Sequence, residues 1–445
     1  MAPLILKPES PAHGGACIAR ERGSSGAGSA GPGAPRGEPP LKQGGKVWLV
    51  SYALPGEVVE AEPRGRQGGV DIASALHVIE ASPHRVLPKC PHFGPGASQP
   101  DFLTRCGGCQ WQHAGYAYEL ELKRQIVADA WRRAGVELPA GTQVLGMDDP
   151  WRYRIRGEFE AIETAGGVRF GFHPMRSHTV QPISTCPIHD ERIERAVKAF
   201  AQAASELRIR GLQNLLLTVE PGGPGLLWRV RFRGRVSGRP DAELAGRVAE
   251  LLGDQVLLDD AISLEFWGMT FRVRSDTFVQ TNYQQMLVLY ETALDMLAPA
   301  KGDRVLDLYA GIGTISAAVA RKADSVTAVE ENPRAVQLGR LNARINSARV
   351  EYLPGKVETA LRQVRIGRHQ AAVLDPPRAG CEPEALAEII RLGPEKLVYI
   401  SCEPSTHARD LAALTRGGYR IERAAIVDMF PHTYHIESVA LLKRS

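Results

Sequence analysis

The chain has no long hydrophobic run, and this absence sets the first limits on its function. No stretch of about 18 consecutive apolar residues occurs in its 445 residues, so we expect no transmembrane helix. The apolar part of the opening MAPLILKPESPAHGG is too short for a secretory signal peptide, and we expect a cytoplasmic protein with no membrane partner. The length allows two or three domains, each with its own core.

A strong charge of one sign is also missing. The sequence has 54 Lys and Arg against 50 Asp and Glu, a net charge of +4, which excludes a uniformly basic protein of the histone type. A polyanion can still bind where positive charge is concentrated on one face. Arginine supplies most of the positive charge and suits phosphate contacts, although the base composition of the genome would explain the same excess.

Cysteine is scarce, with 7 residues, and four of them stand in a suggestive arrangement. In a reduced compartment, clustered cysteines are candidates for metal ligands or catalysts rather than for disulfides. Cys106 and Cys109 form a CxxC pair, and Cys90 and Cys186 can complete a set of four thiolates. Zinc and a [4Fe–4S] cluster both accept four thiolates, although zinc sites usually contain two such pairs.

Apolar patterning divides the first part of the chain. Residues 1–87 contain alternating strand-like segments with Pro-Gly turns, which predict a small antiparallel β-barrel. Their Gly/Ser/Pro-rich stretch at 24–43 is predicted to be a flexible insertion. Residues 88–112 and 148–274 hold the four clustered cysteines and further alternating hairpins, and predict a central α+β domain.

Two further segments complete the predicted organisation. Residues 113–147 begin with helical periodicity, and we expect them to pack on the C-terminal domain. Within residues 275–445, apolar strands alternate with helical stretches from about position 303 onward. That alternation is typical of a doubly wound α/β domain.

The stretch VLDLYAGIGTISAAVA predicts a strand, a tight turn and a helix. Gly311 and Gly313 let the backbone approach a ligand closely, and Glu330 ends the next strand, where a carboxylate can accept both hydroxyls of a ribose. The dinucleotide fingerprint is incomplete, because Ser316 stands at its third glycine position. Together with Asp307, this pattern favours S-adenosylmethionine over NAD, whereas the glycine turn alone could be purely structural.

Two strand ends carry candidate catalytic residues. Asp375 begins a D-P-P motif after the strand AAVL, where open α/β sheets bind ligands. Amino-group methyltransferases have an aromatic residue after such a motif, and Arg378 replaces it here, which disfavours N-methylation. Cys402 lies at the exit of the next strand, whereas an inert cysteine would normally lie within it, although a small packing residue remains the alternative.

A cysteine at this position suits methylation of carbon 5 of uracil. That carbon becomes nucleophilic only after a thiolate adds to carbon 6. The adduct must then lose the carbon 5 proton to a base, which releases the cysteine. Glu437 stands among apolar residues that raise a carboxylate pKa, and His432 and His435 are rival bases.

The motifs FVQTN, DLYAGIGT, DPPR, SCEPSTHARDL and FPHTYHIE together resemble the RNA 5-methyluridine methyltransferases, over almost the whole chain. The resemblance implies a C-terminal Rossmann-like class I methyltransferase domain at 275–445 that uses S-adenosylmethionine. It implies that Cys402 is the nucleophile and Glu437 the proton acceptor. Thr314 and Lys356 match weaker positions, where the family often has asparagine. The residues that the resemblance places around the cofactor are Gln280, Tyr309, Thr314, Glu330, Lys356 and Asp375.

The resemblance extends to the cysteines. Iron–sulfur members of the family carry CPHFG, then CGGCQ, then a distant CPI, as this chain does. This implies a structural [4Fe–4S] cluster, since methyl transfer requires no electron. The insertion PGASQPDFLTR separates the first two motifs more widely than usual, as a loop that can bulge outward. The implied ligands are Cys90, Cys106, Cys109 and Cys186, and zinc remains the alternative.

RNA is the expected partner of a chain that is expected to be a monomer. HGGACIAR and ALPGEVV resemble a TRAM domain, an oligonucleotide-binding-like barrel that binds single strands through basic and aromatic side chains. Trp48, Tyr52 and Arg85 are candidates for such contacts, although Trp48 also fits a core position. The central hairpins offer a candidate basic face, or simply solvated charges, in Arg152, Arg154, Arg156 and Arg169.

Alternative functions remain open. Bacterial members of the family modify 23S ribosomal RNA or transfer RNA, and the iron–sulfur motif with the TRAM-like barrel favours 23S ribosomal RNA. An RNA 5-methylcytosine methyltransferase also uses a cysteine adduct, but its helper cysteine follows a proline directly, unlike Cys381. A non-catalytic RNA-binding iron–sulfur protein is disfavoured because Cys402, Glu437 and Asp375 are all present. Cys17 and Cys381 look like bystanders.

Overall fold

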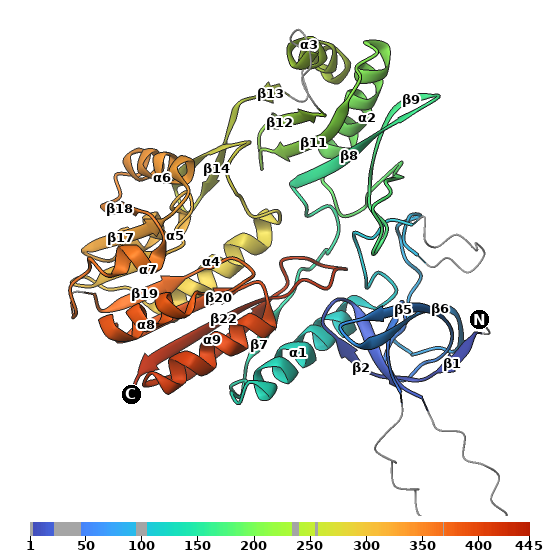
Figure 1. Cartoon of the computed structure of the whole chain (residues 1–445). Helices are drawn as coiled ribbons and strands as arrows, with labels where there is room; N and C mark the ends of the chain where they lie inside the picture. Colours follow the sequence, from blue (N-terminus) through green and yellow to red (C-terminus); the bar gives the residue numbers. More distant parts are fainter. Residues whose placement is uncertain (1–2, 22–45, 95–104, 234–239, 254–256, 368) are drawn as a thin grey trace, which may run out of the picture. The chain divides into compact units, whose positions relative to one another are not determined.

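The computed structural model forms two compact units, Met1–Leu122 with His432–Tyr434 and Lys123–Pro431 with His435–Ser445 (Figure 1). The expected flexible insertion at 24–43 and most of the PGASQPDFLTR insertion lie outside the described residues. No helix within the described residues is long and apolar enough to cross a membrane. The described residues are 3–21, 46–94, 105–233, 240–253, 257–367 and 369–445.

The first unit is built on a six-stranded sheet of order β1-β5-β6-β4-β3-β2 (Figure 1). Only Lys7 separates β1 from β2, so the two edge strands are continuous in the chain and the sheet curls toward a closed form. Trp48, Val50, Val59 and Ala61 belong to its core, because alternate side chains of a strand point to the same face. The strands are β1 (Leu4–Leu6), β2 (Pro8–Ala12), β3 (Ala16–Arg20), β4 (Val47–Ser51), β5 (Val58–Gln67) and β6 (Val70–Glu80).

This packing corrects the candidate RNA contacts of the barrel. Trp48 and Tyr52 are buried, with 4% and 6% of their surface exposed, so neither ring offers a face to a base. Arg85 donates to the buried carboxylate of Glu57 through both Nε and Nη2. These three residues therefore stabilise the unit.

The first part of the second unit contains a six-stranded sheet of order β10-β9-β8-β11-β12-β13. Helix α2 (Glu191–Glu206) packs on one face of it, and α2 also contacts α3 (Pro240–Leu252). A two-stranded sheet follows, formed by β14 (Ala261–Phe266) and β15 (Met269–Arg274). The six strands are β8 (Arg156–Thr164), β9 (Gly167–Phe172), β10 (Gln181–Pro182), β11 (Leu212–Val219), β12 (Gly225–Phe232) and β13 (Leu257–Asp259).

The rest of the second unit is a Rossmann-like domain, as predicted. Its eight-stranded sheet has the order β18-β17-β16-β19-β20-β22-β21-β7, and the five strands from β18 to β20 are parallel. Buried runs such as AAVL are typical of parallel strands that are covered on both faces. The strands are β7 (Gln143–Leu145), β16 (Arg304–Leu308), β17 (Ser325–Glu330), β18 (Val350–Pro354), β19 (Ala371–Leu374), β20 (Lys396–Ser401), β21 (Tyr419–Val427) and β22 (Glu437–Arg444).

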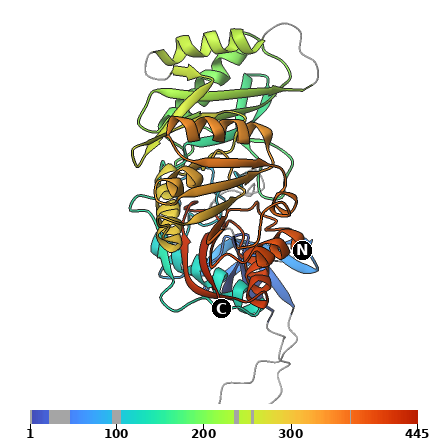
Figure 2. The same ribbon diagram turned by 90° about the vertical axis from the view of Figure 1, so that its left-hand side faces the viewer.

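Helices cover both faces of this sheet (Figures 1 and 2). Helices α4 (Tyr283–Leu297), α5 (Thr314–Ala320) and α6 (Pro333–Ile345) contribute to the main core on one face. Helices α7 (Val357–Leu361), α8 (Pro383–Leu392) and α9 (Pro404–Arg416) cover the other. The helical pattern expected over 113–147 is only partly correct. It forms α1 (Tyr116–Arg133) and then a strand, β7 (Gln143–Leu145), which pairs in parallel with β21.

Candidate active site

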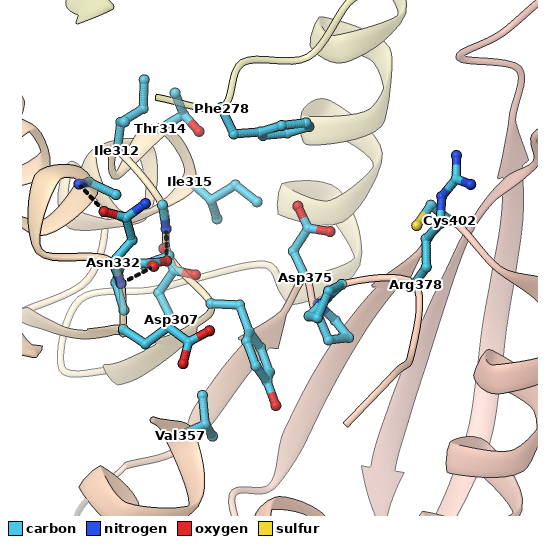
Figure 3. Close-up of a pocket in the computed structure, with 18 of the residues that line it drawn as sticks. Phe278, Asp307, Ile312, Thr314, Ile315, Asn332, Val357, Asp375, Arg378 and Cys402 are labelled. Carbon is cyan, nitrogen blue, oxygen red and sulfur yellow. Dashed lines mark hydrogen bonds between the residues drawn. The ribbon is translucent and has the colours of Figure 1, made fainter. Parts of the chain in front are cut away.

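A cavity of about 630 Å³ opens at the carboxyl ends of the parallel strands (Figure 3). The chain runs from β16 to β17 on one side of the sheet and later to β19 on the other, so the site lies at the topological switch point. The structure places every predicted cofactor and catalytic residue on the wall of this one cavity. They are Gln280, Tyr309, Thr314, Glu330, Lys356, Asp375, Cys402 and Glu437.

The glycine turn after β16 is held to the end of β17. Gly311 and Gly313 have positive φ angles of 54° and 82°, which glycine adopts without strain. The backbone N–H of Gly311 donates to Glu330 Oε2 at 2.9 Å, and that of Asn332 donates to Glu330 Oε1 at 2.7 Å. Any Cβ at position 313 would collide with the hydroxyl of Tyr352. This turn therefore fixes the Glu330 carboxylate at the wall of the cavity.

The ends of two paired strands bring Cys402 and Glu437 to the same edge of the sheet. Strands β20 and β22 are antiparallel, and their last pair is Ser401 of β20 with Ser438 of β22. Cys402 directly follows the end of β20, and Glu437 is the first residue of β22. The two residues are therefore neighbours at the edge of the sheet that borders the cavity.

Three comparisons with known proteins agree with this geometry. The family model described as tRNA (Uracil-5-)-methyltransferase matches residues 356–445, and that of the TRM5/TYW2 methyltransferase domain matches 288–373. An uncharacterized RNA methyltransferase of Halalkalibacterium halodurans is 33% identical over 90% of this chain and 93% of its own length. A second uncharacterized RNA methyltransferase, from Streptomyces avermitilis, is 32% identical over 97% of this chain and 96% of its own length.

The chain belongs to the RNA (uracil-5-)-methyltransferase family. It is an S-adenosylmethionine-dependent enzyme that methylates carbon 5 of uracil in RNA. The crystal structure of the Pyrococcus abyssi tRNA (uracil-54, C5)-methyltransferase in complex with S-adenosyl-L-homocysteine has the same fold. It gives a TM-score of 0.68 with 24% identity, over 89% of this chain and 96% of that one.

Two carboxyl groups, the buried Asp307 and the half-buried Asp375, lie between the glycine turn and Cys402 in this methyltransferase. Figure 3 shows Asp375 between Asp307 and Cys402. Burial raises the pKa of Asp307 to about 7, although the hydroxyl of Ser316 donates to its carboxyl group. Burial, and then the charge of Asp307, raise the pKa of Asp375 to about 7. The methyltransferase therefore keeps two carboxyl groups in the cavity wall that are partly protonated near neutral pH.

The pKa values of Cys402 and Glu437 are also raised, which favours the protonated form of each group. Burial is the largest cause that raises the pKa of the Cys402 thiol to about 12, followed by the charges of Glu437 and Asp375. Burial and then Asp375 raise the pKa of Glu437 well above its usual range. The guanidinium of Arg378, drawn beside Cys402 in Figure 3, opposes both shifts. Arg378 is thus the cation that favours the charged forms of both groups.

The rival bases occupy different environments. His435 lines the cavity, and its Nδ1 lies 3.2 Å from Nη2 of Arg378. His432 is buried, and its backbone N–H donates to Glu119 Oε1 at 2.7 Å. His435 is therefore the rival base that reaches the cavity, whereas the backbone bond of His432 to Glu119 holds the loop that contains it.

The cavity also contains residues that the motif comparison did not single out. Phe278 lines it with 72% of its surface exposed, which is unusual for a phenylalanine. Asn332 begins α6, where its side chain accepts from the N–H of Arg334 while its own N–H holds Glu330. Sequence features could have pointed to both residues. Phe278 is the first residue of the FVQTN motif, and Asn332-Pro333 is typical of the start of a helix.

Three of the clustered cysteines lie in one local structure of the first unit. The N–H of Cys106 donates to the carbonyl of His92 at 3.0 Å, and the N–H of Cys90 donates to Gln112 Oε1 at 3.0 Å. The CPHFG and CGGCQ motifs therefore meet, even though ten residues between them lie outside the described ones. Among the described residues, no group of three or more His, Cys, Asp or Glu side chains is placed to hold a metal ion.

Cys186 lies in the second unit, where its turn is held by its neighbours. Its N–H donates to Glu194, and Arg152 Nη1 donates to its carbonyl at 3.2 Å. Arg152 also pairs with the Glu194 carboxylate at 3.0 Å. This corrects the expected basic face, because Arg152 stabilises the Cys186 turn, while Arg169 remains exposed on β9.

Proposed function

We propose that this methyltransferase acts on a uridine of 23S ribosomal RNA, with Cys402 as the nucleophile and Glu437 as the proton acceptor. The observation that carries the catalytic assignment is that Cys402 and Glu437, which adjoin the last residue pair of β20 and β22, line the same cavity. The iron–sulfur motif and the TRAM-like N-terminal sequence support the choice of RNA.

The cavity fits the methyl donor. Its volume of about 630 Å³ lies within the range of roughly 300–1,000 Å³ that small-molecule sites occupy. The fixed carboxylate of Glu330 suits the ribose hydroxyls, and Gln280, Tyr309, Thr314 and Lys356 line the same space. When bound, S-adenosylmethionine supplies an electrophilic methyl group.

The first step belongs to Cys402. The target uridine must leave its stack before its carbon 6 can reach the thiol. Sγ then forms a bond to carbon 6, and the resulting enolate makes carbon 5 nucleophilic. Burial raises the pKa of the Cys402 thiol to about 12, so the thiol must first give its proton to solvent water and react as the thiolate. Arg378 and the N-terminal end of α9, which begins two residues after Cys402, both favour the thiolate.

The second step belongs to Glu437. After carbon 5 receives the methyl group, the ionised carboxylate takes the carbon 5 proton, and the electrons of that bond expel the Cys402 thiolate. A raised pKa makes Glu437 a stronger base, while Arg378 limits the rise so that the carboxylate form remains accessible. Asp375 adjoins both groups and adjusts their charge.

Two substitutions test these roles. Cys402→Ser should form no 5-methyluridine, because a serine hydroxyl is a far weaker nucleophile. Glu437→Gln should accumulate a covalent protein–RNA complex, because addition and methylation proceed while elimination stops. If Glu437→Gln yields no complex on denaturing gels while Cys402→Ser is inactive, the proton is taken by another group, and His435 is the next residue to substitute.

The RNA target needs a separate experiment. Transfer RNA is the second candidate, since the matching family model and the Pyrococcus abyssi enzyme are both named for it. We expect deletion of the gene to remove one 5-methyluridine from 23S ribosomal RNA and none from transfer RNA. Loss from transfer RNA alone would transfer the assignment to that substrate.

We also propose that Cys90, Cys106, Cys109 and Cys186 hold a structural [4Fe–4S] cluster. The CxxC spacing and the bond between Cys106 and His92, which brings the first two motifs together, support it. Protein purified without oxygen should contain about four iron and four sulfide per chain. If the purified protein contains one zinc per chain and no iron, the four cysteines form a zinc site and the proposed cluster is wrong.

A further inference from the structure

The loop that carries Arg378 is held by one helix. Residues 375–382 join β19 to α8, and their backbone groups lie outside any strand or helix. Helix α9 supplies the partners for several of these groups, from successive turns of its first half. The bonds are Thr406 Oγ1 to the carbonyl of Arg378 at 3.0 Å, Arg409 Nη2 to the carbonyls of Ala379 at 2.9 Å and Cys381 at 3.2 Å, and the N–H of Cys381 to Asp410 Oδ2 at 2.8 Å.

Asp410 is the centre of this arrangement. Its carboxylate is fully buried and accepts from three donors. Oδ2 accepts from the N–H of Cys381 and from the hydroxyl of Tyr399 at 2.6 Å, and Oδ1 accepts from Arg409 Nε at 2.8 Å. A buried charge needs such partners to offset its lost hydration. The carboxylate thus orients Arg409, which in turn holds two carbonyls of the loop.

Glycine at position 380 supports the same conclusion independently. Gly380 has a φ angle of +77°, and a Cβ there would lie 2.5 Å from Asp410 Oδ2 and 2.6 Å from Arg409 Nη2. Any side chain would therefore push the loop away from α9. The sequence keeps this position open so that the loop backbone can approach the carboxylate.

Helix α9 also follows closely on the proposed nucleophile. Cys402 lies between the end of β20 and the start of α9 at Pro404, so the same helix adjoins Cys402 at its start and holds the Arg378 loop along its side. Arg378 acts on Cys402 and Glu437 through its charge, and that effect falls steeply with distance. A loosened loop would therefore change the reactivity of Cys402 without touching it.

We propose that Asp410, acting through Arg409, is a positioning residue that holds the 378–381 loop against α9 and so keeps Arg378 beside Cys402. This inference rests on the proposed role of Cys402. Neither Asp410 nor Arg409 is among the residues that line the cavity, so neither is a catalytic residue. A purely stabilising role would predict a lower melting temperature with unchanged chemistry in the folded enzyme.

The test compares Arg409→Gln with Arg391→Gln. Arg391 is a matched control on α8: it pairs with Glu388 and donates to the carbonyl of Leu361 at 2.9 Å, away from the loop. We expect Arg409→Gln and Asp410→Asn to lower kcat roughly 10- to 100-fold, as small misplacements do, with little change in KM for S-adenosylmethionine. Arg391→Gln should keep the kcat of the unaltered enzyme.

A second readout measures the thiol directly. Alkylation of Cys402 by iodoacetamide, followed peptide by peptide, should be slower at a given pH in Arg409→Gln and Asp410→Asn, because Arg378 favours the thiolate. Wild-type kcat and wild-type alkylation in Arg409→Gln, whose side chain is half-exposed and tolerant of substitution, would overturn the inference even if Asp410→Asn fails to fold. If Cys402→Ser still forms product, the proposed nucleophile is wrong, and the two failures are distinguished.

Discussion

The cavity of the second unit and the cysteine segment of the first unit are both rich in residues that the sequence singled out, but they are built differently. The cavity residues follow successive strands of one sheet, so strand order and register bring them together. The cysteines come from irregular segments, one of which is interrupted by residues outside the described ones. In a strand, the position of a residue in the sequence determines where its side chain lies in the sheet. In a loop, specific contacts must fix each residue, such as the hydrogen bond between the N–H of Cys106 and the carbonyl of His92.

The largest expected effect separates the two kinds of cysteine. Cys402→Ser should lower kcat by at least ~10³-fold, as loss of a nucleophile does, with an unchanged melting temperature. Cys17→Ser, at a buried cysteine of the first unit that does not line the cavity, is the control and should keep most activity. Activity assays and thermal melts of both variants distinguish a catalytic cysteine from one that is only buried. Equal losses in both would mean that the assay reports packing rather than chemistry.

Cys106→Ser should lower stability and leave catalysis nearly unchanged, which is the reverse of the result expected for Cys402→Ser. If Cys106 holds the proposed cluster, we expect loss of bound iron and a lower melting temperature, while the folded fraction keeps a kcat within a few-fold of the unaltered enzyme, because methyl transfer requires no electron. Iron analysis, thermal melts and single-turnover assays test this. A kcat loss as large as that of Cys402→Ser, in fully folded protein, would show that the cysteine segment serves catalysis.

Buried carboxyl groups should make the stability of the second unit depend on pH. The pKa of Asp307 is about 7 in the folded state and near 4 when unfolded, so the folded state binds more protons between these values. Stability should therefore fall as pH rises from about 4 to 7, by at most about 4 kcal/mol for this group. Asp307→Asn should flatten the profile in urea titrations from pH 5 to pH 8. An unchanged slope would contradict the raised pKa.

Phe278 should give the smallest effect, and one confined to RNA binding. Its exposed ring can stack on a base, a contact worth about 1–3 kcal/mol. Phe278→Ala should raise the KM for RNA and leave the melting temperature and the KM for S-adenosylmethionine nearly unchanged. Trp48→Phe, in the core of the first unit, is the contrasting variant and should lower the melting temperature instead. An unchanged KM for RNA in Phe278→Ala would show that the Phe278 ring does not stack on a base of the RNA.

The sequence predicted the Rossmann-like domain and the residues around the cavity because strand–turn–helix patterns and strand-end motifs are local signals. It left two readings open for Trp48 and Arg152, and it offered Tyr52 and Arg85 as RNA contacts although both pack within the first unit. A charged or aromatic residue on an alternating strand looks the same in the sequence whether it faces solvent or a buried partner. The strand at 143–145 was missed for a related reason: its pairing with β21 is made with residues far away in the chain. The proposed role of Asp410 was also invisible, because two of its partners, the N–H of Cys381 and the hydroxyl of Tyr399, come from other segments of the chain.

The central claim is that Cys402 bonds to the target uridine and Glu437 releases it. The most direct measurement is peptide mapping of the Glu437→Gln enzyme after reaction with its RNA and digestion by nuclease and protease. The account predicts a peptide that contains Cys402 with one methylated uridine nucleotide attached to its sulfur. A nucleotide attached to any other residue, or no attachment while the substrate is consumed, would contradict it.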